Sequence, residues 1–167
     1  MNYKHLKIKH MKKVMMALCT LALCVGFVAC SSNDDEEKTV AEKVVGTYIG
    51  KTSTAFQYSP TPLVTQDDSI VVVKGANNTV NIEFRSRRWG KAVFTNAQVT
   101  ESATGYTFAE TTGTAAVPSE RQPGKIVNYT CKLNGSISKN SKNETNFTIA
   151  IQGLMGGTTM TFTSKAN

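Results

Sequence analysis

The stretch KIVNYTCKLNGSIS, residues 125–138, has the clearest two-residue alternation in the sequence. Five of its apolar residues occupy alternate positions, with an interruption at Gly135: Val127, Tyr129, Cys131, Leu133 and Ile137. The positions between them are polar: Asn128, Thr130, Lys132, Asn134 and Ser136. Because successive side chains of a strand point to opposite faces, this pattern predicts a β-strand with one buried and one solvated face.

Seven further stretches have short runs of Val, Ile, Thr, Tyr and Phe separated by Gly- and Asn-containing turns. These composition signals predict strands at 45–51, 69–74, 79–85, 91–101, 106–110, 145–152 and 158–165, the first open to extension as far as Gln57. Residues 111–124 carry Thr, Pro and Gly and are predicted to form a long loop. From residue 44 onwards, helical spacing is absent.

Eight consecutive strands, each with one apolar face, can close into an antiparallel up-and-down β-barrel. Closure leaves no exposed edge strand, which would otherwise favour aggregation. The sequence therefore predicts one all-β domain over residues 44–167, with a β-sandwich as the alternative architecture.

Short motifs across this domain favour the barrel. They are Val45-Gly46-Thr47-Tyr48 with Gly50, Val99-Thr100-Glu101 before Gly105-Tyr106, Asn134-Gly135-Ser136-Ile137 and Met160-Thr161-Phe162-Thr163. Residues 45–164 resemble the calycin-like domain, a family of small secreted lipoprotein barrels related in shape to lipocalins. The resemblance implies an eight-stranded barrel and implies no particular activity or functional residue.

The N-terminus has the organisation of a secretory signal. Residues 1–13 contain five lysines and no acidic residue, and residues 14–29 carry no charge. This segment is shorter than the ~20 apolar residues that span a bilayer, which argues against a transmembrane helix. The sequence Phe27-Val28-Ala29-Cys30 resembles a bacterial lipobox, which implies cleavage after residue 29 and lipidation of Cys30. We expect Cys30 to anchor the protein to the membrane through its acyl chains.

Residues 30–43 are expected to form a flexible acidic tether, because the run from Asp34 to Glu37 has too few apolar groups to fold. Serines followed by acidic residues directly after Cys30 also resemble the export signal of surface lipoproteins in some Gram-negative bacteria. The predicted location is therefore the outer membrane, with the domain exposed at the cell surface.

Charge and reactive residues exclude several classes of function. Removal of residues 1–29 leaves 14 of the 19 basic residues against 12 acidic ones, a net charge of +2 that does not suggest a nucleic-acid-binding protein. Both histidines are removed with the signal, which leaves no Ser-His-Asp or Cys-His arrangement. Cys131 lies on the apolar face of its strand and is expected to be buried. We therefore predict no enzymatic activity, no metal and no cofactor.

Two smaller features allow different interpretations. Asp67 and Asp68 are adjacent and are interpreted as solvated loop residues, with calcium binding as the alternative. Asp68-Ser69-Ile70 resembles a short O-glycosylation site of exported bacterial proteins, so glycosylation of Ser69 is an open question.

The predicted topology places alternate loops at opposite ends of the barrel. Loops 75–78, 102–105 and 138–144 share the end at which the domain begins, and loops 58–66, 86–90, 111–124 and 153–157 share the other. Ligands of such barrels bind at the mouth. This second set of loops contains several Arg residues and the Trp, residue types that are enriched where binding energy concentrates. The candidate binding residues are therefore taken from these loops: Tyr58, Arg87, Arg88, Trp89, Arg121 and Met155.

Two functions remain open from the sequence. The first is a binding module for a small amphipathic or anionic ligand, or a glycan, at the barrel mouth. The second is a protein-interaction module, such as an inhibitor, an adhesin or a subunit of an envelope complex. Trp89 itself has two interpretations, a recognition residue that stacks on a ligand or a side chain that packs over the barrel end.

Overall fold

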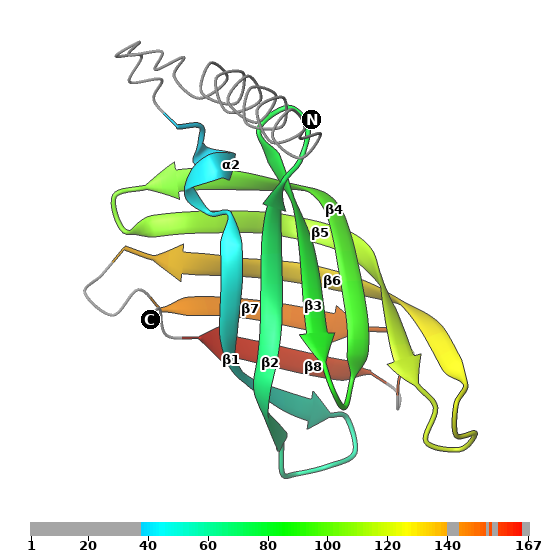
Figure 1. The fold of residues 1–167 in the computed structure, drawn as a ribbon. Coiled ribbons are helices and arrows are strands. Elements are labelled where there is room, and N and C mark those ends of the chain that lie inside the picture. Colours follow the sequence, from blue (N-terminus) through cyan, green and yellow to red (C-terminus); the bar gives the residue numbers. More distant parts are fainter. Residues whose placement is uncertain (1–37, 140–143, 153, 155–156, 165–167) are drawn as a thin grey trace, which may run out of the picture. The chain divides into compact units, whose positions relative to one another are not determined.

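The structure is a computed structural model that describes residues 38–139, 144–152, 154 and 157–164. Eight antiparallel strands form a closed barrel in which each strand pairs with its neighbours in the chain and β1 pairs with β8 (Figure 1). The strands are β1 (Gly46–Phe56), β2 (Leu63–Lys74), β3 (Thr79–Ser86), β4 (Gly90–Ser102), β5 (Gly105–Pro118), β6 (Ile126–Ser138), β7 (Thr145–Ile151) and β8 (Thr158–Ser164). The predicted barrel is therefore confirmed, and the sandwich is excluded because β1 and β8 close the sheet.

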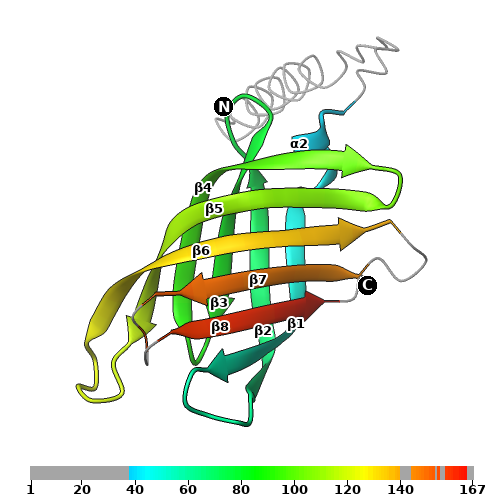
Figure 2. The same ribbon diagram turned by 180° about the vertical axis from the view of Figure 1, so that it is seen from behind.

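The alternation of residues 125–138 is also confirmed in β6. Cys131 and Leu133 are fully buried, whereas Asn134 and Ser136 are exposed. Figure 2 shows β6 between β5 and β7, which supply its two pairing partners. The large apolar side chains of the strands fill the barrel interior, where five phenylalanines are almost completely buried: Phe84, Phe94, Phe108, Phe147 and Phe162.

Gly135 is the one residue without a side chain on the inward face of β6. It pairs with Phe108 of β5 on one side and with Phe147 of β7 on the other. The two rings meet with their centroids 5.0 Å apart, and a Cβ at position 135 would lie 2.3 Å from Cδ1 of Phe147. The space that a side chain would take is therefore occupied by an aromatic pair.

Two strands are longer than the sequence predicted. β5 continues to Pro118, so most of the predicted loop 111–124 is strand and only 119–125 connects β5 to β6. β2 begins at Leu63 rather than at Ser69 and accommodates a bulge near Asp67, which has φ +59°. The β5 extension is rich in Thr and Ala, and the β2 extension ends in two aspartates, so local composition did not indicate a strand in either case. Pairing with the neighbouring strands β6 and β1 stabilises the two extensions.

A short helix, α2 (Val40–Lys43), precedes β1. Thr39 caps it with a capping box: the backbone of Glu42 donates to Oγ1 of Thr39, and the backbone of Thr39 donates to Oε2 of Glu42 at 2.8 Å. Ala41 and Val44 are buried in the barrel core. Residues 39–43 are thus folded onto the barrel, which corrects the prediction that the flexible tether extends to residue 43; residues 1–37 lie outside the described part.

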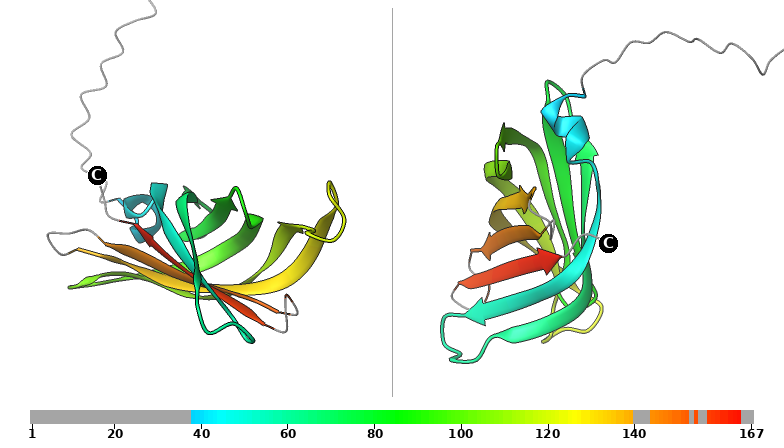
Figure 3. Two further views of the ribbon diagram at one scale, coloured as in Figure 1. Left: turned by 90° about the horizontal axis from the view of Figure 1, so that it is seen from below. Right: turned by 90° about the vertical axis from the view of Figure 1, so that its left-hand side faces the viewer.

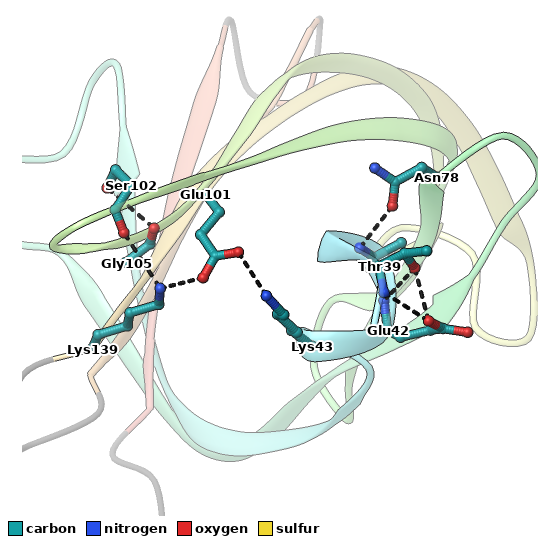
Figure 4. A network of polar contacts seen from close by, with 9 residues as sticks. Thr39, Glu42, Lys43, Asn78, Glu101, Ser102, Gly105 and Lys139 are labelled. Carbon is teal, nitrogen blue, oxygen red and sulfur yellow. Dashed lines mark hydrogen bonds and ion pairs between the residues drawn. The ribbon is translucent and has the colours of Figure 1, made fainter. Parts of the chain in front are cut away.

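Polar contacts attach α2 to the neighbouring loops (Figure 4). The backbone N–H of Ala41 donates to Oδ1 of Asn78 at 3.0 Å, and Lys43 pairs with Glu101 at 3.0 Å. Glu101 also pairs with Lys139, beyond the end of β6. The β2–β3 and β4–β5 turns therefore share the end of the barrel at which the domain begins, as the topology predicted; we call this the α2 end.

The opposite end of the barrel is called the mouth. It is formed by the β1–β2 loop (57–62), the β3–β4 turn (87–89), the β5–β6 loop (119–125) and Leu154 between β7 and β8. Figure 3 shows α2 at one end of β1 and the β1–β2 hairpin at the other.

Candidate functional site

A pocket with a volume of about 640 Å³ opens at the mouth. This is within the range of ~300–1,000 Å³ that is usual for small-molecule sites. Its lining comes from three loops and the ends of two strands: Arg88, Trp89, Val117, Pro118, Ser119, Glu120, Arg121, Val127, Tyr129 and Leu154. The pocket therefore has an apolar wall together with three charged side chains.

The β3–β4 turn that carries Arg88 and Trp89 is held by the side chain of Ser86. Its hydroxyl accepts hydrogen bonds from the backbone N–H of Arg88 at 3.3 Å and of Trp89 at 3.2 Å. Gly90 follows with φ +74°, and a Cβ there would lie 2.2 Å from the carbonyl oxygen of Ala116. Only glycine fits this close approach at positive φ, so the turn is fixed against β5.

Trp89 packs into the barrel end. It is only 5% exposed, and its ring centroid lies 5.7 Å from that of Phe56. Its indole nitrogen is buried without a hydrogen-bond partner in the described part of the chain. The packing interpretation of Trp89 is therefore correct, although the side chain also contributes to the pocket wall.

The guanidinium of Arg88 lies over the Trp89 ring, 5.4 Å from its centroid, and Nη2 pairs with Oε1 of Glu120 at 3.0 Å. This ion pair joins the β3–β4 turn to the β5–β6 loop. The loop is closed by its own hydrogen bonds: Ser119 N–H donates to Lys125 O at 2.8 Å, and Gln122 N–H donates to Ser119 Oγ at 3.2 Å. These hydrogen bonds fix the conformation of the loop that carries Glu120.

Most of the apolar wall was missed by sequence reasoning, which singled out only Leu154 of its residues at this end. Val117 and Pro118 end β5, in the stretch predicted as loop, and Val127 and Tyr129 begin β6. Leu154 is held from β8, because the hydroxyl of Thr158 donates to its carbonyl oxygen at 2.9 Å. The length of β6 was a usable signal, because a strand of 13 residues needs a partner of similar length, and the five residues predicted at 106–110 could not supply it.

The structure brings together three of the predicted binding residues, Arg88, Trp89 and Arg121. Arg87 and Tyr58 are exposed but do not line the pocket, and Tyr58 is 81% exposed. Met155 and Cys30 lie outside the described residues. The pocket therefore takes in one side of the predicted loop cluster, the side where β3–β4, β5–β6 and β7–β8 meet.

The candidate nucleophile Cys131 and the candidate calcium ligands Asp67 and Asp68 do not line the pocket. Cys131 is fully buried, and burial raises the pKa of its thiol to about 11, so the thiol is protonated at neutral pH. Asp67 and Asp68 lie within β2, which corrects their assignment to a loop. Asp68 is buried and accepts a hydrogen bond from the hydroxyl of Thr65. Within the described ranges, no three His, Cys, Asp or Glu side chains gather as metal ligands would.

A model of the family described as "Calycin-like beta-barrel domain" matches residues 44–165, and the chain belongs to this family. Among solved structures, a crystal structure from Bacteroides fragilis NCTC 9343, described as a "putative outer membrane protein", is similar with a TM-score of 0.60 and 22% sequence identity. The match covers 76% of this chain and 46% of that protein, so this chain spans less than half of its length. A search of curated proteins gave no match. In the described residues, no helix has the length and apolarity needed to cross a membrane.

Proposed function

We propose that this protein is a lipid-anchored, non-enzymatic binding module of the outer membrane that takes a small amphipathic or anionic ligand, or a glycan, at the barrel mouth. The pocket carries the proposal: it combines an apolar wall of Val117, Val127 and Leu154 with the cations Arg88 and Arg121. A few charged groups at the rim of an apolar cleft are typical of small-molecule sites, where the polar groups orient the ligand.

The proposed location rests on the signal-like N-terminus and Cys30. The domain begins at the α2 end, and the pocket lies at the other end of the barrel. A lipid on Cys30 would hold the α2 end nearest the membrane, because the eight residues from 31 to 38 span at most about 29 Å. The mouth would then face away from the membrane, as expected for a capture protein at the cell surface.

The anchor and its orientation are tested in cells. Mass spectrometry of the mature N-terminus should find an acylated Cys30, and Cys30→Ser should release the protein from the membrane fraction. Protease added to intact cells should cleave the wild-type domain. An unmodified Cys30, or full protection from protease, would contradict the anchor or the surface location respectively.

Binding at the mouth is tested with the protein purified from its native membrane. Native mass spectrometry should detect a bound small molecule that is lost from Val127→Trp, since a large side chain at this half-buried position of the pocket fills it. The control is Val73→Trp, which places the same side chain at an exposed position of β2, nearer the α2 end. Equal occupancy of both variants would contradict binding at the mouth.

A further inference from the structure

Glu120 forms an ion pair with the guanidinium of Arg88 in this structure. Oε1 of Glu120 lies 3.0 Å from Nη2 of Arg88, and both residues line the pocket at the mouth. Because an arginine fork matches a carboxylate in shape and charge, the protein's own carboxylate stands where the carboxylate of a ligand would bind.

The Arg88–Glu120 pair is easy to displace. The two side chains are 51% and 64% exposed, and an exposed ion pair contributes only about 0–1 kcal/mol to stability. Arg88 itself stays positioned without Glu120, because Ser86 holds the turn and the Trp89 ring lies beneath the guanidinium. Arg121 also lines the pocket and has no ion pair within the described part of the chain, so it is available as a second cation.

The rest of the pocket wall favours a ligand with an apolar body over a sugar. The side chains of Val117, Val127 and Leu154 offer no hydrogen bonds, and beside them Tyr129 adds an aromatic ring with a single hydroxyl group. A glycan carries hydroxyl groups all round, and burying hydroxyls without partners costs free energy. An apolar body with one anionic end satisfies both parts of the site.

We infer that the pocket takes an amphipathic carboxylate, whose carboxylate displaces Glu120 from Arg88 while its apolar body lies against the wall formed by β5, β6 and Leu154. This inference rests on the proposed function and narrows it to one ligand class. Glu120 acts as an internal competitor, which lowers the affinity for anions and leaves the affinity for neutral amphiphiles unchanged.

The experiment uses the full chain in lipid nanodiscs, with empty nanodiscs as the blank. The probes are 4-phenylbutyrate, its neutral analogue 4-phenyl-1-butanol, and maltotriose as a neutral sugar. Affinities are measured by calorimetry, and Trp89 fluorescence gives a second readout because Trp89 is the only tryptophan in the sequence.

We expect the wild type to bind 4-phenylbutyrate more tightly than the alcohol. Glu120→Gln should tighten 4-phenylbutyrate binding by about 2–5-fold, the range that corresponds to loss of an exposed ion pair, with no change for the alcohol. Arg88→Gln should reduce the preference for the carboxylate to what Arg121 alone supplies, and Glu120→Gln should then have no further effect on affinity. The control is Glu110→Gln, which removes a similar exposed pair with Lys132 away from the pocket and should change no affinity.

The outcomes separate this inference from the proposed function. If the alcohol binds as tightly as the carboxylate, or if Glu120→Gln has no selective effect, the inference is wrong and a binding module remains. Binding of maltotriose alone also overturns the inference and leaves the glycan form of the proposed function. If none of the three probes binds, the inference is wrong, and the proposed binding at the mouth is decided separately by native mass spectrometry of the Val127→Trp and Val73→Trp variants.

Discussion

The backbone N–H of Ala41 donates a hydrogen bond to Oδ1 of Asn78, 37 residues further along the chain, with a donor–acceptor distance of 3.0 Å (Figure 4). Asn78 has φ +58°, a left-handed conformation that asparagine tolerates better than most residues. One asparagine therefore both completes the β2–β3 turn and attaches the N-terminal segment to the barrel.

Asn78→Ala should lower the free energy of unfolding by about 2 kcal/mol. About half of this is the lost hydrogen bond, and the rest is the cost of placing alanine at positive φ. Asn77→Ala is the matched control, because Asn77 also has positive φ (+49°) but makes no hydrogen bond to α2. Urea denaturation should show a loss about 1 kcal/mol larger for Asn78→Ala, and equal losses would contradict the role of this bond.

Gly135→Ala should destabilise the barrel by about 2–3 kcal/mol, because the added methyl group overlaps the Phe147 ring and the backbone of Asn146. Gly46→Ala is the control: it is also a strand glycine, but its added Cβ would meet nothing closer than 3.9 Å. Thermal unfolding followed by circular dichroism measures both. A Gly135→Ala variant as stable as Gly46→Ala would show that the Phe108–Phe147 pair can move apart without cost.

The attachment of α2 should weaken in acid. Hydrogen bonds from Lys74 and Thr39 lower the pKa of Glu42 to about 2, and Lys139 and Lys43 lower the pKa of Glu101 below its usual value. Because both pKa values are lower in the folded state, the stability they contribute is fully present above the unfolded pKa of about 4.3 and is lost as pH falls towards the folded values.

This prediction is checked by comparing the wild type with Glu42→Gln/Glu101→Gln. The wild type should have the higher Tm at pH 7, and the difference should shrink below about pH 4.5, be largely lost at pH 2 and vanish only below the folded pKa of Glu42. Glu110→Gln, whose pair with Lys132 lies away from α2, serves as the control for loss of a surface charge. A difference as large at pH 2 as at pH 7 would show that the glutamates do not act through their charge.

Cys131 should not react with a thiol reagent in the native protein. Its side chain is fully buried, and burial raises the pKa of its thiol to about 11, so neither access nor thiolate is available at pH 8. Ellman's reagent should modify Cys131 only as fast as the barrel unfolds, and should do so readily in urea. Rapid modification without denaturant would contradict the closed interior between β5 and β7.

The sequence was sufficient to predict the strand order and the two ends of the barrel. Alternation in residues such as Val127, Cys131 and Leu133 follows directly from the geometry of a strand. Eight such strands allowed a barrel or a sandwich, and the resemblance to the calycin-like domain favoured the barrel. The position of Arg88, Trp89 and Arg121 at one end followed from counting turns. These features depend on local spacing, which the sequence contains explicitly.

The tertiary structure alone decided the length of β5, the fold of residues 39–44 and the composition of the pocket. β5 continues to Pro118 because the long strand β6 offers its backbone partners, although Thr and Ala give no strong local preference for a strand. Ala41 and Val44 are ordered because the barrel end provides apolar surface and Asn78 provides an acceptor. Trp89 packs against Phe56, and Glu120 pairs with Arg88, in both cases across about 30 positions of the chain. Such contacts depend on how the barrel closes in space, and no local sequence pattern encodes them.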